Sequence, residues 1–193
     1  MIHDLGLLVA RLVLGGSYAS HGAQKAFGWF EGPGPQGAAG FMESLGFKPG
    51  EKFATSASYA ELAAGTMIAL GLGGPIGPGI LIAGMLVAQE TVHRKNGFYA
   101  SKGGVEVGVL YAAGALALAS SGYGEASLDH ALGLDKTLRH PAFTALALAG
   151  GIAAGYSMLQ QRDTSPPSGT LATPTIKGER NGSVGTDPTP ARN

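Results

Sequence analysis

Five apolar runs, separated by Gly/Pro-rich or polar turns, dominate the pattern of hydrophobic and polar positions along the chain. They cover residues 5–30, 53–73, 76–92, 105–120 and 142–159. A run of about 20 apolar residues has the length of a helix that crosses a bilayer. The pattern therefore predicts an all-α integral membrane protein with four antiparallel transmembrane helices, followed by a fifth, C-terminal one.

The same pattern divides the chain into three parts. Residues 1–133 are the predicted four-helix core, residues 134–160 a linker with the fifth helix, and residues 161–193 a tail. The tail is rich in Pro, Ser, Thr and Gly and cannot build a core, so we expect it to be disordered. Between the first two runs, residues 37–47 are predicted either as a short helix on the membrane interface or as a buried turn.

The first apolar run carries ionisable residues at helical spacing. On a helix, Arg11, Tyr18 and Lys25 lie seven residues apart, and so do Leu14 and His21, which places all five on one inward-pointing stripe. The opposite face holds Leu, Val, Ala and Gly, which suit contact with lipid or with another helix. Ionisable groups inside a membrane span are energetically costly, so the stripe indicates function.

Composition narrows the functional classes. The chain is 45% apolar and 13% charged, against roughly 25% charged residues in an ordinary soluble domain. This balance favours the lipid bilayer as a partner. The formal net charge is zero, so we expect no nucleic acid as a partner. The chain has no cysteine, which excludes disulfides, thiol catalysis and cysteine-ligated zinc or iron–sulfur sites within it.

Alternation of the five spans sorts the basic residues unevenly between the two membrane sides. One side receives Lys25, Lys48, Lys52, Arg94, Lys95, Lys102 and Arg162, whereas the other receives Lys136 and Arg139. The side richer in Lys and Arg is usually cytoplasmic. We therefore expect a multi-pass protein whose basic loops lie in the cytoplasm.

This threading also brings polar residues of four helices together in the cytoplasmic half. The candidate pocket consists of His21, Lys25, Glu61, His93 and Glu106, with Arg11, Tyr18 and Glu90 as secondary candidates. Glu61 lies about 12 Å inside the second run, at a rise of 1.5 Å per residue. Arg11 lies nearer the opposite face, where its side chain can snorkel outward as an anchor.

Two interpretations of this convergence stay open. In the first, these are boundary residues in contact with water or headgroups, and Glu61 pairs with Lys25 or His21 to hold the helices together. In the second, they line a polar pocket, because a buried charge needs a partner. Such a pocket can hydrogen-bond a quinone and relay its protons, ligate a metal or line a transport path, and His21 and His93 can be axial haem ligands. The chain carries no recognised metal-binding motif.

Six segments of the chain carry a more specific pattern. They are ARLVLG (10–15), HGAQKAFGWFEGPG (21–34), the span around Glu61, TVHRKNGFY (91–99), GGVEV (103–107) and SLDHALG (127–133). Together they closely resemble the DoxX family of small bacterial membrane proteins, over about residues 5–133. The resemblance implies a four-helix bundle in the bacterial inner membrane. It also implies that the candidate pocket residues and Arg11 match the polar positions typical of the family.

The resemblance implies a redox role. Members of the family include a subunit of a thiosulfate:quinone oxidoreductase, and a member linked to a membrane complex with superoxide dismutase and a sulfurtransferase. By resemblance, the chain is an integral membrane component of an oxidoreductase or redox-stress complex. Its candidate ligand is a quinone, and its candidate partners are those soluble enzymes. A homo-oligomer is also a compatible assembly. Whether it is an enzyme stays open; if so, it is a quinone-linked oxidoreductase subunit. A non-catalytic scaffold that docks soluble enzymes and a small transporter are the alternatives.

Overall fold

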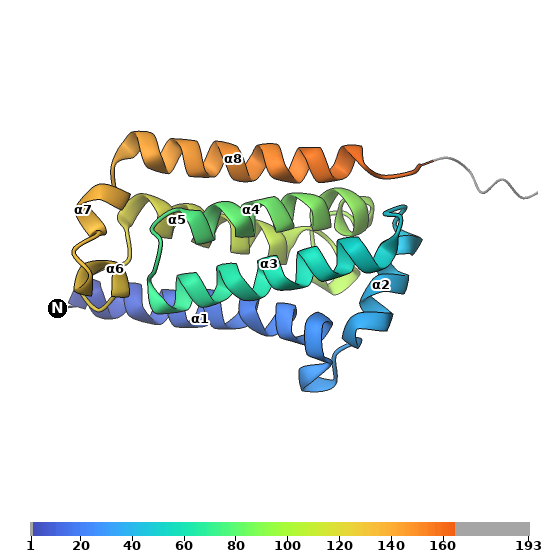
Figure 1. Ribbon diagram of the computed structural model, residues 1–193, viewed down its shortest axis with the longest axis horizontal. Helices are drawn as coiled ribbons and strands as arrows, with labels where there is room; N and C mark the ends of the chain where they lie inside the picture. The colour runs from blue at the N-terminus through green and yellow to red at the C-terminus, as the bar shows by residue number, and fades with distance from the viewer. Residues whose placement is uncertain (1, 165–193) are drawn as a thin grey trace, which may run out of the picture.

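The computed structural model describes residues 2–164, which form helices joined by turns and contain no strand (Figure 1). The long helices are α1 (Ile2–Phe27), α3 (Gly50–Leu70), α4 (Ile76–Ala88), α5 (Glu106–Ser121) and α8 (Pro141–Gln160). Consecutive long helices run antiparallel, as the five apolar runs predict. Most of the predicted disordered tail, from residue 165 onward, lies outside the described residues.

Short helices occupy the two ends of the bundle. They are α2 (Gly34–Ser44), α6 (Leu128–Ala131), α7 (Asp135–Leu138) and the 3₁₀ turns η1 (Trp29–Glu31), η3 (Arg94–Asn96) and η4 (Ala100–Lys102). Helix α2 covers most of the segment for which a short helix or a buried turn was expected. Because Ala38 is buried whereas Phe41 is 51% exposed, the segment is a helix on the surface of the bundle, and the buried turn is wrong.

The third long helix changes its winding before it ends. After Ala88 the backbone continues as a five-residue π-helical turn, η2 (Gln89–His93), with helical dihedral angles at Gln89 and Arg94. Together α4 and η2 cover the predicted run 76–92 without a break. A π-helical turn inside an α-helix is rare and is often found at a functional site.

Glycines bring α1 and α3 into backbone contact. A Cβ atom added at Gly15 would lie 2.5 Å from the backbone nitrogen of Ala69, and one added at Gly22 would lie 2.5 Å from that of Leu62. Gly65 of α3 faces the backbone of α1 in the same way. Small residues permit this close approach of two helices, which occurs on both sides of Glu61 along α3.

Helix α8 packs against α4 through a second set of glycines. Gly151 lies against the backbone of Gly79, and a Cβ atom added at Gly155 would lie 3.0 Å from the carbonyl oxygen of Ala83. Gly151 and Gly155 form a G-x-x-x-G arrangement. This arrangement is a helix-packing surface.

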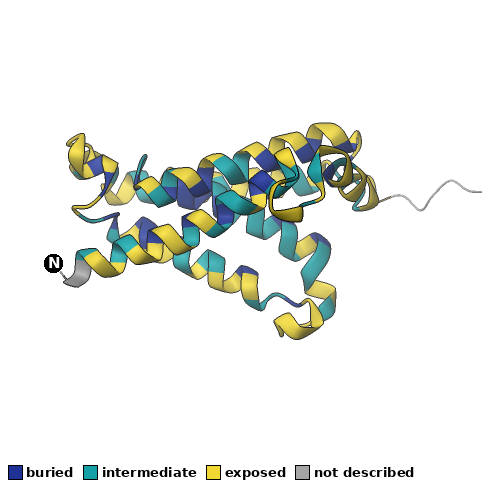
Figure 2. Cartoon of the chain, turned by 90° about the horizontal axis from the view of Figure 1, so that it is seen from below, coloured by how far each residue is buried: buried dark blue, intermediate teal, exposed yellow. Residues whose placement is uncertain are grey.

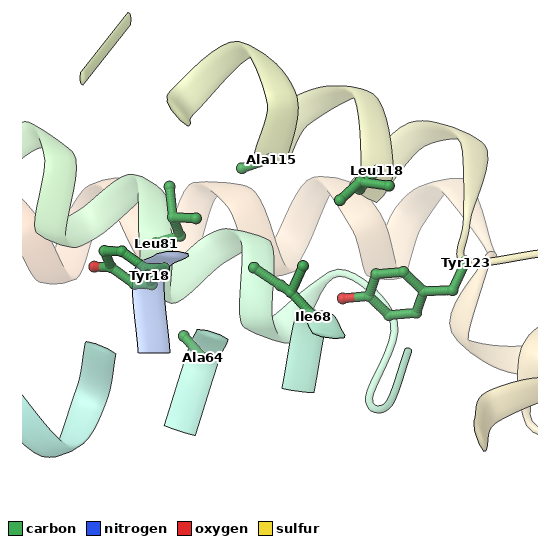
Figure 3. Packing of buried hydrophobic residues seen from close by; sticks show 7 residues of the cluster. All are labelled: Tyr18, Ala64, Ile68, Leu81, Ala115, Leu118 and Tyr123. Carbon is green, nitrogen blue, oxygen red and sulfur yellow. The ribbon is translucent and has the colours of Figure 1, made fainter. Parts of the chain in front are cut away.

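The apolar core runs along the centre of the bundle. One cluster of buried side chains draws on α1, α3, α4 and α5 and includes Tyr18, Ile68 and Leu81 (Figure 3). The outer faces of the helices remain exposed over most of their length (Figure 2), and they carry large apolar side chains such as Leu12, Val13 and Leu146. A smaller cluster of Phe47, Phe53 and Val87 closes the opposite end of the bundle from Tyr123.

One helix among the described residues, α8, is long and apolar enough to cross a membrane. Helices α1 and α3 have sufficient length, with 26 and 21 residues, but carry the ionisable residues that the sequence singles out. Helices α4 and α5 are shorter, with 13 and 16 residues. The all-α fold is therefore confirmed, and the transmembrane four-helix bundle stays a prediction.

Candidate functional site

A cavity of about 350 Å³ lies at the end of the bundle where α1 ends and α3 begins. Its walls come from α1, α3, α4, the π-helical turn η2, the turn after η4, and α5. The polar side chains that line it are Tyr18, His21, Lys25, Glu61, Gln89, His93 and Tyr111. We call this space the polar cavity. Four of the five candidate pocket residues therefore lie around it, and Glu106 does not.

An ion pair between α1 and α3 forms one wall. The Nζ atom of Lys25 lies 2.5 Å and 2.7 Å from the two carboxylate oxygens of Glu61. The two side chains are 31% and 12% exposed, respectively. Of the two partners that the sequence offers for Glu61, the structure selects Lys25. The pair leaves no net charge on this wall.

The imidazole of His93 is held by a backbone carbonyl. Its Nδ1 atom lies 2.7 Å from the carbonyl oxygen of Gly103. Because a carbonyl oxygen only accepts, Nδ1 carries the hydrogen, and Nε2 of the neutral ring carries a free lone pair. His93 can therefore accept a proton or a hydrogen bond through Nε2. Asn96 donates to the same carbonyl at 3.2 Å, which fixes the turn around it.

Three aromatic rings stand in series along α1 and α5. The ring centroids of Tyr18 and Tyr111 are 6.1 Å apart, and those of His21 and Tyr111 are 6.4 Å apart. Tyr18 is 1% exposed, as its place on the inward stripe predicts. His21 is exposed, so its predicted place on the inward-pointing stripe is wrong. The reason is that position 21 lies at the edge of the stripe, beside α5.

Gln89 is a lining residue that sequence reasoning missed. Its Oε1 atom is buried and has no hydrogen-bond partner within residues 2–164. Its amide packs directly over Gly108 of α5, where a Cβ atom would collide with it. The sequence does contain one signal for Gln89: it lies four residues before His93, and residues at this spacing share one face of a helix. The π-helical winding that directs both side chains to the cavity leaves no mark in the residue pattern.

Two candidate carboxylates lie outside the cavity. Glu106 accepts a hydrogen bond at 2.8 Å from the backbone nitrogen of Ala100, so it holds the turn at η4. Glu90 is exposed and pairs with Arg94, whose Nη1 atom lies 2.7 Å from Oε2. Neither carboxylate therefore lines the cavity, because Glu106 bonds the backbone of the turn before α5 and Glu90 pairs with a residue one helical turn away.

Arg11 lies at the opposite end of the bundle, and the expectation that it snorkels outward is wrong. Its side chain is 1% exposed, because the segment between α5 and α6 folds over it. Its Nη2 atom donates to the carbonyl oxygen of Ala126 at 2.5 Å, and the guanidinium lies 5.8 Å from the ring centroid of Tyr123. Its Nε and Nη1 atoms have no partner in the described part of the chain. Arg11 therefore joins α1 to the segment after α5, at the end far from the polar cavity.

The segment that covers Arg11 is tied to the turn between α3 and α4. Asp129 is 3% exposed and accepts hydrogen bonds from the backbone nitrogens of Gly73 and Gly74, at 2.8 Å and 2.7 Å. These bonds give a structural account of the SLDHALG segment. Within residues 2–164, no group of three or more His, Cys, Asp or Glu side chains is placed to hold a metal ion.

Comparison with known proteins gives a family match. The family model described as DoxX matches residues 6–94, which confirms the predicted resemblance. The matched segment runs from α1 to the end of η2 and contains every polar lining residue of the cavity except Tyr111. No curated protein and no solved structure gives a match.

Proposed function

Because residues 6–94 belong to the DoxX family, we propose that this protein is a multi-pass membrane protein that binds a quinone in the polar cavity as part of an oxidoreductase complex. The observation that carries the proposal is the set of groups around one cavity. It combines the Lys25–Glu61 ion pair, the available Nε2 atom of His93 and the unpaired amide oxygen of Gln89.

Several features support a membrane location for the whole bundle. Helix α8 meets the length and composition of a membrane span. The α4–η2 helix has 13 + 5 = 18 residues, which is within the range that can span a bilayer. Within α1 and α3, Lys25 and Glu61 line the polar cavity and Arg11 is buried, whereas Asp4, Glu51 and Lys52 lie in the first turns of the two helices. The charges of Lys25, Glu61 and Arg11 are therefore largely shielded from lipid.

The arrangement of the helix ends supports an orientation. The end of α8 lies beside the turn between α2 and α3, where Arg162 donates to the carbonyl oxygen of Leu45 at 2.8 Å. Five consecutive antiparallel helices place the basic loops at this same end, which also holds the polar cavity. By the excess of Lys and Arg, this end faces the cytoplasm.

The residues of the cavity fit a quinone by the chemistry of their donors and acceptors. A bound quinone supplies a carrier of two electrons and two protons. The Lys25 ammonium can donate to a carbonyl oxygen, while Nε2 of His93 can accept a proton from a hydroxyl. Gln89 can donate or accept, which satisfies its buried amide. The paired charges of Lys25 and Glu61 suit an uncharged ligand.

The proposal is tested by quinone binding to the purified protein in nanodiscs. Wild-type protein is expected to retain decylubiquinone or a menaquinone analogue, as measured by native mass spectrometry. Glu61→Gln and His93→Gln are expected to weaken that binding, because each removes a group of the cavity. Glu90→Gln is the matched control, since it removes a carboxylate at the same end that does not line the cavity. Absence of binding to the wild-type protein, or equal binding by all variants, would refute the proposal.

A second candidate function, a scaffold for soluble enzymes, draws on a different surface. Lys52, Lys95 and Lys102 are exposed at the end that holds the basic loops. A scaffold predicts that substituting these lysines with serine abolishes co-purification of the partner enzymes, whereas Glu61→Gln leaves it intact. The reverse pattern would assign the partners to the polar cavity instead.

A further inference from the structure

A second cavity, of about 390 Å³, lies between α3, α4 and α8. Most of its lining is apolar and small, with residues such as Ala57 of α3, Ala83 of α4, and Ala147 and Ala154 of α8. Ala154 is exposed, so the cavity reaches the outer surface of the bundle. We call this space the apolar groove. Helix α8, which lies beyond the matched segment 6–94, completes it.

The apolar groove and the polar cavity share a wall. Tyr18 and Glu61 line both of them. Tyr18 is 1% exposed, and its hydroxyl points away from the other labelled core residues (Figure 3). The hydroxyl lies against Gly84 of α4, where an added Cβ atom would collide with its oxygen. Glu61 turns both oxygens to Lys25. The polar atoms therefore collect at the junction of the two spaces.

We propose that the ligand of the polar cavity is amphipathic, with its polar head there and its isoprenoid or alkyl tail in the apolar groove. This inference rests on the proposed function, because the head is the quinone ring of the preceding section. The tail passes Tyr18 and Glu61, and the Tyr18 hydroxyl hydrogen-bonds the head. The groove is suited to a tail because a chain of methylene groups needs an apolar surface and no hydrogen bonds.

The experiment compares a quinone without a tail, ubiquinone-0, with decylubiquinone, which has the same head and a ten-carbon tail. Dissociation constants are measured for both ligands in one detergent by isothermal titration calorimetry. The test variant is Ala154→Leu, which fills the groove from α8. The matched control is Ala153→Leu, because Ala153 is the exposed neighbour that does not line the groove. Ala57→Leu, with Ala63→Leu as control, repeats the comparison from α3.

Ala154→Leu is expected to weaken decylubiquinone binding about tenfold, which corresponds to roughly two methylene groups no longer buried. It should leave ubiquinone-0 binding within about twofold of wild type, and Ala153→Leu should leave both ligands unchanged. Unchanged decylubiquinone binding in both groove variants would overturn the inference, since the tail would then lie elsewhere and a lipid chain or second copy would be the occupant. If the wild-type protein binds neither ubiquinone-0 nor decylubiquinone, the proposed function is refuted, and the inference with it.

Discussion

Lys25 and Glu61 form an ion pair that joins α1 to α3, with Nζ 2.5 Å and 2.7 Å from the two carboxylate oxygens. The pair lies next to the place where the backbones of the two helices meet, since a Cβ atom on Gly22 would lie 2.5 Å from the nitrogen of Leu62. The ion pair therefore contributes both to helix packing and to the wall of the polar cavity. These two contributions can be separated by mutation.

Removing one partner of this pair should destabilise the fold moderately. We expect Glu61→Gln or Lys25→Met to lower the free energy of unfolding by about 1–2 kcal/mol, because the remaining charge is left without its partner in a partly buried site. Lys25 is 31% exposed, so the loss should be smaller than for a fully buried pair. The measurement is denaturant unfolding of each variant in the same detergent.

The double variant distinguishes pairing from simple loss of a charge. With both Lys25→Met and Glu61→Gln present, no lone charge remains, so the combined loss should be smaller than the sum of the two single losses. Glu90→Gln serves as a control at an exposed pair, where we expect a change of about 0.5 kcal/mol or less. Strictly additive losses at Lys25 and Glu61 would show that the two side chains do not interact.

Gly108→Ala should perturb the polar cavity without removing any polar group. A methyl group at this position would collide with the amide of Gln89, so Gln89 must leave its place against α5. We expect quinone binding to weaken about fivefold, because the displaced amide of Gln89 loses its hydrogen bond to the ligand, which contributes about 1 kcal/mol. Gly114→Ala on the same helix is the control, because its new methyl group would meet Leu14 at an ordinary 3.4 Å. Equal binding by both variants would show that the position of Gln89 is unimportant.

The helices were predictable from the sequence because each apolar run is bounded by Gly, Pro or polar turns. The seven-residue spacing also placed Arg11 and Tyr18 correctly on the inward stripe, and both are 1% exposed. The same spacing failed for His21, which lies at the edge of the stripe. Whether a residue at this edge is buried depends on how α1 is rotated relative to α5. Tertiary packing decides this rotation.

The residues that line the polar cavity were predictable only in part. Threading the helices brought His93 to the end of the bundle that holds Lys25 and Glu61, since that step depends on helix length and direction alone. It could not show that Glu106 bonds the backbone of Ala100 instead, because loop geometry decides that contact. The π-helical turn at Gln89 and the apolar groove behind Glu61 both depend on contacts with α5 and α8, which have no local signature.

Gly151→Ala should loosen α8 from α4. A Cβ atom at Gly151 would lie too close to the carbonyl group of Gly79, so the two helix backbones must move apart. We expect a loss of about 1–3 kcal/mol in the free energy of unfolding, and faster proteolysis of α8. The adjacent Gly150 is the matched control, because a Cβ atom there would meet nothing within 4 Å. A Gly151→Ala variant as stable as Gly150→Ala would contradict the packing of α8 on α4.

Tyr123→Phe should leave the stability unchanged or raise it, although Tyr123 is only 4% exposed. Its hydroxyl is buried and has no hydrogen-bond partner in the described part of the chain, so removing it removes a desolvated polar group and no bond. Burial also raises the pKa of the hydroxyl above its usual value, an effect to which the nearby charge of Asp129 adds. The hydroxyl therefore stays neutral at physiological pH and contributes no charge opposite Arg11.

The ring of Tyr123, by contrast, should matter, because it lies beside the guanidinium of Arg11 at 5.8 Å. We expect Tyr123→Phe to change the free energy of unfolding by at most about 0.5 kcal/mol, and Tyr123→Ala to lower it by about 3–5 kcal/mol. Unfolding curves of the two variants in one detergent measure the difference. A large loss in Tyr123→Phe would mean that the hydroxyl has a partner, and that the end of the bundle around Arg11 is held by a polar network rather than by ring packing.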